Sequence, residues 1–174
     1  MDDANLLNWV KEVLSTGPSR WKQLVEALPT ELLVERPAPN EWSAVECLLH
    51  ILETEKVFNL RLNAFLEGRD FPGFNPDREG ALADSASLPS SLSAEFTRLR
   101  SASLKALENL TPADLDRQAR HAELGPVTLR EMLNEWAGHD LMHTVQAEQA
   151  MMQPFIQGCG PWVVYFKDHV VKHN

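Results

Sequence analysis

Apolar residues recur at a helical spacing along most of the chain, and the alternating β-branched runs typical of strands are nearly absent. Residues 3–28 carry one such stripe, which begins with Leu6 and Val10. The pattern predicts a first helix over these residues. Gly17 and Pro18 interrupt the stripe. Because proline lacks a backbone N–H, we expect a kink or a restart of the helix there.

Two capping boxes indicate where further helices begin. Ser43 is followed three residues later by Glu46, and Thr128 is followed three residues later by Glu131. In this motif the hydroxyl and the acid each satisfy a backbone N–H at the start of a helix. The helices expected from these starts and from the apolar spacing cover residues 43–67, 89–110 and 128–152.

The connections suggest how these helices are organised. Residues 68–87 form a long loop that suits a lid or a subunit contact, and residues 116–127 look irregular, with room for a brief extended piece. The tail run 162–166, Trp-Val-Val-Tyr-Phe, is too apolar to stay in solvent. We expect it to dock on its own bundle or on a second copy, and we favour a homodimer. Residues 1–174 are therefore predicted to form one all-α domain, a four-helix bundle with a short C-terminal docking segment.

Composition narrows the class of protein. The chain has 174 residues, enough for one domain with its own core, and a net charge of -9 from 25 acidic and 16 basic residues. Such a charge disfavours nucleic-acid binding, which depends on Lys and Arg at phosphates. Cys47 and Cys159 are too few for a disulfide scaffold. No apolar run approaches the ~20 residues of a membrane span, and the acidic N-terminus does not resemble a signal peptide. A cytoplasmic protein without membrane or nucleic-acid partners is expected.

The histidines carry the candidate chemistry. His139 and His143 are four residues apart, so both rings lie on one helix face about one turn apart. His50 lies midway along the other capped helix. Helical bundles build metal sites in their cores from facing helices, and catalytic zinc commonly has three protein ligands. The spacing predicts one divalent transition-metal site, although a histidine on an apolar face is also often a satisfied core residue.

Other histidines are expected outside this site. His169 and His173 have the same spacing but lie at the C-terminus, where chain ends fray. We predict that His173 is solvated and leave His169 open. His121 falls in a predicted loop and should also be solvated.

Two segments resemble a known family. Residues 40–50, Asn-Glu-Trp-Ser-Ala-Val-Glu-Cys-Leu-Leu-His, resemble the second helix of the DinB-like superfamily of damage-inducible helical-bundle proteins, which carries a metal-binding His about two turns after a Trp-Ser pair. Residues 138–146 resemble its fourth helix, where two ligating His four apart precede a Gln. The resemblance follows the helix order over nearly the whole chain. It implies that the metal ligands are His50, His139 and His143.

The chain departs from that family pattern at three positions. Thr144 and Val145 replace a frequent Arg-Gly pair, and Trp136 stands where many members have another His. The ligand triad is unaffected. Zinc or nickel is the metal most expected, although imidazoles also accept copper and iron.

The resemblance also implies an activity. Related bundles with this triad include transferases and isomerases that use small thiols such as bacillithiol, mycothiol or glutathione. It therefore favours a metal-dependent thiol S-transferase in stress response or detoxification, with a small thiol and an electrophile as partners. A metal-dependent hydrolase and a non-catalytic metal-binding or interaction protein remain alternatives.

Several acids and a thiol lie near the expected ligands. Glu46 is accounted for by its capping box, whereas Glu53 or Glu55 would either orient an imidazole or a bound water, or simply be solvated. Cys47 is more suited to a small buried apolar role than to a thiolate ligand.

Amide and aromatic side chains are the remaining neighbours. Gln146 lies on the His143 face, where its amide could contact that ligand or a substrate. Trp42, Trp136 and Phe58 are expected in the core rather than as pocket walls.

Overall fold

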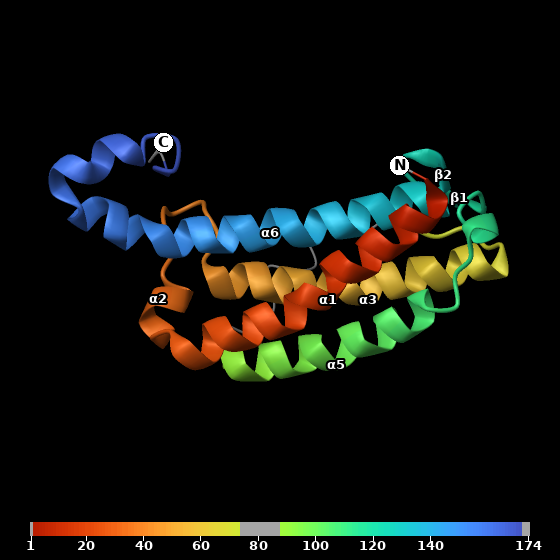
Figure 1. The fold of residues 1–174 in the computed structure, drawn as a ribbon, viewed down its shortest axis with the longest axis horizontal. Helices are drawn as coiled ribbons and strands as arrows, with labels where there is room; N and C mark the ends of the chain where they lie inside the picture. Colours follow the sequence, from red (N-terminus) through yellow and green to blue (C-terminus); the bar gives the residue numbers. More distant parts are fainter. Residues whose placement is uncertain (1, 74–87, 172–174) are drawn as a thin grey trace.

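The computed structural model describes residues 2–73 and 88–171. Within these ranges the chain forms an elongated all-α bundle, as predicted (Figure 1). α1 packs against α5 and α6, and α3 packs against the same two helices, so α1 and α3 lie diagonally across the bundle. The long helices are α1 (Asp3–Ala27), α3 (Ala44–Glu67), α5 (Pro89–Leu107) and α6 (Leu129–Gly158).

Short elements complete the described fold at the ends of the bundle. A hairpin of β1 (Gln118–His121) and β2 (Gly125–Thr128) pairs antiparallel and leads directly into α6 (Figure 1). It occupies the stretch that the sequence left irregular. Gly125 adopts a φ of 80°, a left-handed conformation that favours glycine at this turn. The other short elements are α2 (Thr30–Val34), η1 (Pro112–Asp114) and η2 (Gly160–Tyr165).

The predicted helix starts are confirmed, and two helix ends differ. α5 ends at Leu107 rather than at Leu110. Ser43 and Thr128 each cap a helix in a complete capping box. α6, however, continues through Pro154 to Gly158 rather than ending at Met152. Ile156 lies beyond the proline and is buried, so packing stabilises the last turns of the helix despite the missing N–H.

α1 is also continuous, so of the kink or restart predicted at Gly17 and Pro18 the restart is wrong. Pro18 has no N–H for the carbonyl of Leu14, which would otherwise accept the helical hydrogen bond. Nη1 of Arg100, on α5, donates to that carbonyl over 2.9 Å instead. A Cβ at Gly17 would lie 3.3 Å from the Phe96 ring, so glycine permits this close packing. Tertiary contacts therefore compensate for the local helix breakers.

A buried polar layer divides the core. Arg100 is fully buried and forms bidentate ion pairs with Glu55 of α3 and with Asp140 of α6. On one side lies an apolar cluster that includes Phe58 and on the other a cluster that includes Phe96. Because Arg100 also binds the Leu14 carbonyl, one side chain connects all four long helices.

The apolar run of the C-terminal tail does not dock on its own bundle, which was one of the two arrangements expected from the sequence. Trp162 and Tyr165 in η2 are 66% and 75% exposed, so the apolar run does not fold back onto its own bundle. The tail is held instead through Gln153, whose amide donates to the carbonyl of His169 over 2.9 Å and accepts from the N–H of Val171 over 3.0 Å. Docking of the apolar run on a second copy stays a prediction. In the parts of the chain that the structure describes, no helix has both the length and the apolar character of a membrane span.

Candidate metal centre

Two capped helices bring the candidate ligands together. Ser43 fixes the start of α3, and His50 follows about two turns later on the side that packs against α6. The Thr128 capping box fixes the start of α6, and His139 and His143 lie one turn apart on the face toward α3. The sequence expectation that these three histidines meet is thus what the structure shows.

The three imidazoles form one compact group. One nitrogen from each of His50, His139 and His143 lies within 4.8 Å of the other two. The Nε2 atoms of His50 and His139 are 3.0 Å apart. Because metal–imidazole bonds are about 2.1 Å long, three nitrogens at these separations can share one ion after small side-chain adjustments.

One ligand is oriented by a hydrogen bond. The Nδ1–H of His143 donates to Oε1 of Gln146 over 2.8 Å, which leaves the Nε2 lone pair of His143 directed at the group. This is the usual role of a residue beside a metal-ligating histidine. Within the described ranges His139 has no such partner, because its Nδ1 is buried without a hydrogen bond there. The Phe58 ring packs edge-to-face against the His139 ring instead, at 5.7 Å between ring centroids.

Low pKa values keep two of the candidate ligands neutral, which favours metal binding. The pKa of His139 is lowered to about 3, mainly by burial and in smaller part by the neighbouring groups His143, His50, Arg100 and Arg61. Burial also lowers the pKa of His143, although the hydrogen bond with Gln146 opposes this. Both rings are therefore neutral at pH 7, the form that coordinates a cation. The donor set fits a borderline divalent metal such as zinc.

Trp42 forms an aromatic wall of the group. Its ring stacks on His143 at 5.6 Å between centroids and lies 4.8 Å from the centroid of His50. Trp42 is only partly buried, so it lies at the edge of the site rather than in the core as the sequence suggested. Phe58 and Trp136 are buried and stack on each other, which confirms their expected place in the core.

Comparison with known proteins places this geometry in a family. The DinB superfamily profile matches residues 14–147. The chain belongs to the DinB superfamily. YfiT from Bacillus subtilis, described as a probable metal-dependent hydrolase with an unusual four-helix bundle topology, is 20% identical with a TM-score of 0.75, over 86% of this chain and 87% of that one. The DinB-like protein YjoA from Bacillus subtilis is 21% identical with a TM-score of 0.57, over 83% and 91%. At these identities the two structures show a shared fold. No curated protein matches the chain.

The glutamates of this DinB-superfamily chain are engaged elsewhere. Glu55 is fully buried and binds Arg100, Ser103 and the indole N–H of Trp136. It is thus neither solvated nor an orienting group for an imidazole, contrary to both sequence interpretations. Glu53 is partly exposed and pairs with Lys56 over 2.6 Å.

Two further residues behave as the sequence suggested. Cys47 is fully buried, and burial raises the pKa of its thiol to about 12. This residue is therefore a small apolar core side chain rather than a thiolate ligand. Glu46 completes the Ser43 capping box and also pairs with Arg36.

The remaining histidines lie apart from the triad. His121 is 6% exposed and contacts Arg61, so the prediction that it is solvated is wrong. The reason is the hairpin, which turns this ring inward against α3. His169 is exposed in the tail, and His173 lies outside the described residues.

Sequence reasoning missed the ion-pair layer beside the site. Arg100 lies on the same stripe of α5 as Phe96 and Leu107, both buried. A charged residue on an apolar stripe indicates a buried partner, but the sequence does not show which acid it meets. Asp140, next to the ligand His139, is that partner together with Glu55.

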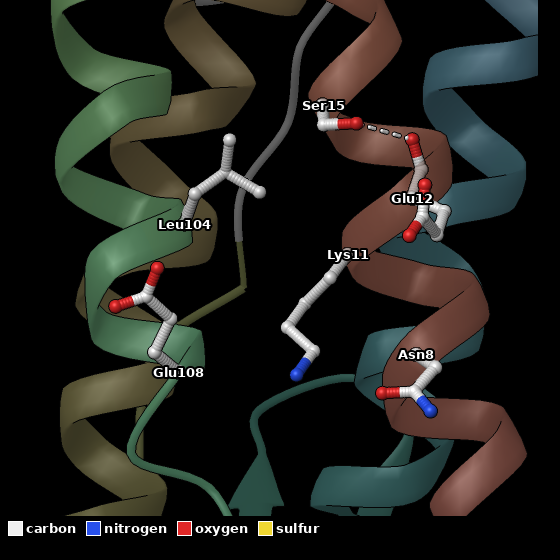
Figure 2. Close-up of a pocket in the computed structure, with 6 residues that line it drawn as sticks. All are labelled: Asn8, Lys11, Glu12, Ser15, Leu104 and Glu108. Atoms are coloured by element: carbon white, nitrogen blue, oxygen red, sulfur yellow. Dashed lines mark hydrogen bonds between the residues drawn. The ribbon is translucent and has the colours of Figure 1, made fainter.

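A hollow on the other side of the bundle is unrelated to this chemistry. It lies between α1 and α5 and has a volume of about 320 Å³ (Figure 2). Its lining side chains are mixed in charge and contain no histidine or cysteine, so they do not resemble a transition-metal site. They are Asn8, Lys11, Glu12, Ser15, Leu104 and Glu108.

Proposed function

We propose that His50, His139 and His143 hold one divalent transition-metal ion, zinc or nickel, and that the chain is a metal-dependent thiol S-transferase for small molecules. The observation that carries this proposal is the convergence of three imidazole nitrogens within 4.8 Å. Among the described residues, no carboxylate or thiol joins that group. Three neutral protein ligands leave a coordination position open, as in catalytic sites.

The chain's own residues divide the remaining tasks. A metal bound there would supply a Lewis acid that lowers the pKa of a thiol. Gln146 holds the His143 ring in the orientation needed for binding. Trp42 offers an apolar wall beside the site for the electrophile. Because Glu55 and Asp140 are paired with Arg100, neither is available as a base, which favours a nucleophile brought by the substrate.

Metal-dependent hydrolysis is a second candidate, favoured by the description of the structurally similar YfiT as a probable metal-dependent hydrolase. The same Lewis acid would then act on water. Thiol-dependent turnover would support the transferase and water-only turnover the hydrolase. A metal-loaded protein with neither activity against a panel of electrophiles and esters would support a binding role.

The test is a pair of matched histidine variants. His143→Ala should remain helical by circular dichroism, lose the metal measured by elemental analysis, and lose thiol-dependent turnover with it. His169→Ala removes an exposed histidine outside the triad and should retain both. Turnover by metal-free wild-type protein would contradict the proposal.

We further propose that the chain forms a homodimer through α6 and the tail. Large apolar side chains on these elements are exposed, and grouped apolar side chains on a surface are typical of contact sites between proteins. Light scattering should give twice the 19.6 kDa of one chain, and Trp162→Ser should lower that mass whereas Trp9→Ser on α1 should not. A single monomeric species for the wild type would refute the dimer. The exposed side chains are Leu141, Met142, Val145, Phe155, Trp162, Val163, Val164 and Tyr165.

A further inference from the structure

A buried arginine, Arg100, and a partly buried one, Arg61, differ sharply in how many of their N–H groups have acceptors. Arg100 is fully buried and donates to two carboxylates and a backbone carbonyl. Arg61 is only 12% exposed, yet its nearest carboxylate, Glu135, is 3.7 Å away and 55% exposed. Its buried Nε has no hydrogen-bond partner among residues 2–73 and 88–171. All the N–H groups that Arg100 directs into the core thus meet acceptors, in structural ion pairs or at the backbone carbonyl. Arg61, in contrast, has one N–H without an acceptor in these ranges, and its positive charge is balanced weakly by an exposed carboxylate.

The contact between Arg61 and His121 is also incomplete. Nδ1 of His121 accepts hydrogen bonds from the backbone N–H groups of Glu123 and Leu124 at 3.1 and 3.3 Å. A neutral imidazole with Nδ1 as acceptor carries its hydrogen on Nε2. That Nε2 lies 3.1 Å from Nη2 of Arg61, which is also a donor. Two N–H donors therefore face each other in a part-buried place, and among the residues that the structure describes neither has an acceptor at this contact.

A bound oxyanion would supply acceptors both for the N–H groups of Arg61 and for the Nε2–H of His121. A carboxylate has two acceptor oxygens, which match the planar fork of a guanidinium and leave lone pairs for a neighbouring N–H. The position also has aromatic walls, because the Arg61 guanidinium lies 5.9 Å from the Phe58 ring centroid and 5.5 Å from that of Phe71. Burial lowers the pKa of Arg61, and Glu135 and Glu123 oppose this, but a guanidinium stays charged at neutral pH. The site is thus cationic, planar and partly dehydrated.

This position lies on the same helix–helix interface as the histidine triad. Phe58 contacts both ends, at 5.7 Å from the His139 ring and 5.9 Å from the Arg61 guanidinium. Glu135, the ion-pair partner of Arg61, precedes His139 by four residues of α6, so the two lie about one helical turn or ~6 Å apart along the axis. A separation of this order is within the length of a small molecule.

We propose that Arg61 and His121 form a carboxylate-binding position, and that the small molecule handled at the histidine triad carries a carboxylate bound there. The first half stands on the Arg61–His121 geometry, and the second half rests on the proposed function. Guanidinium and imidazole N–H groups hold the carboxylate at one end, so that the reactive end of the molecule is directed to His50, His139 and His143.

The carboxylate position is tested first in metal-free protein. Hexanoate should shift the side-chain NMR signals of His121 in a saturable way, and hexanol should not. Inorganic phosphate is titrated in parallel. A null result with hexanoate, or tighter binding of phosphate than of hexanoate, would overturn the carboxylate assignment.

Charge variants decide whether Arg61 is responsible. Arg61→Gln should weaken hexanoate binding by about tenfold or more, since charge-assisted hydrogen bonds are the strong ones. Arg98→Gln removes the same charge from an exposed ion pair and should leave binding unchanged. Glu135→Gln removes a competing carboxylate and should tighten binding. This gain cannot come from misfolding, so equal or weaker binding by Glu135→Gln would refute the proposal even if Arg61→Gln fails to fold.

The link to the triad is tested with cobalt-loaded protein and matched thiols. Binding of 6-mercaptohexanoate and of 6-mercaptohexanol is followed through the optical spectrum of the cobalt. The acid should bind about tenfold more tightly, and Arg61→Gln should abolish that preference without weakening the alcohol. Equal binding of acid and alcohol would refute the link but leave the proposed function intact. If neither thiol perturbs the cobalt spectrum while hexanoate still binds metal-free protein through Arg61, the proposed thiol chemistry fails and the carboxylate position stands.

Discussion

Replacing Arg100 by Met tests the buried ion-pair layer most directly. The guanidinium makes five hydrogen bonds, to Glu55, Asp140 and the Leu14 carbonyl. Arg100→Met leaves two buried carboxylates without their cation. Removing one partner of a buried ion pair typically costs about 3–5 kcal/mol. A second route gives a similar figure, because protonating one carboxyl of ordinary pKa near 4 at pH 7 costs about 4 kcal/mol.

The pH dependence of this loss follows from Asp140. Burial raises the pKa of its carboxyl above 3.8, and Arg100 opposes that rise, so Arg100→Met should raise it further. The folded variant then binds more protons than the unfolded chain, and its stability falls as pH rises through the folded pKa. The destabilisation should therefore shrink from about 4 kcal/mol at pH 7 to about 1–2 kcal/mol at pH 5.

Urea unfolding followed by circular dichroism at the two pH values measures both effects. Arg98→Met, on the same helix but in an exposed pair with Glu95, is the control and should leave the urea midpoint unchanged. Adding Asp140→Asn to Arg100→Met should remove most of the pH dependence. A loss below about 1 kcal/mol at pH 7, or a loss that grows toward pH 5, would refute the reasoning.

Three further outcomes are expected. The pKa of His139 is lowered from 6.5 to about 3, mainly by burial, so between these pH values the metal-free folded protein binds fewer protons than the unfolded chain. The free energy of unfolding should therefore be highest above pH 6.5 and fall as pH falls toward 3. His139→Asn should not show this fall in urea titrations. Gln146→Leu should weaken metal affinity by about 10–100-fold in a chelator competition, whereas Gln149→Leu should not, and equal affinities would contradict the orienting role. Folded protein should react with a thiol reagent at Cys159 but not at Cys47, whose thiol pKa is raised to about 12, and modification of Cys47 before unfolding would contradict its burial.

Helix starts were predictable because their signals are local. Ser43 and Thr128 each lie three residues from the acid that completes a capping box, and both helices begin there. The continuation of α1 through Pro18 was not predictable in this way. The compensating donor is Arg100, whose place beside the Leu14 carbonyl depends on how α5 packs on α1.

In the candidate site, too, local features were predictable from the sequence and long-range contacts were not. Helical spacing explains why His139 and His143 share a face, and the bundle arrangement explains why His50 meets them. The environments of Glu55 and His121 could not be inferred, because their partners are distant in sequence. Glu55 meets Arg100 from another helix, and the hairpin turns His121 toward Arg61.

The proline in α1 has a consequence for topology. Amphipathic helices of similar length can often slide past one another by a turn while still covering their apolar faces. Pro18 leaves the carbonyl of Leu14 without its helical donor, and Arg100 is positioned to bind it. A turn of slippage would bring Arg100 to a carbonyl already occupied within the helix and strand the one at Leu14. Pro18 thus favours a single axial alignment of α1 with α5. It disfavours misassembled bundles that apolar burial alone would tolerate.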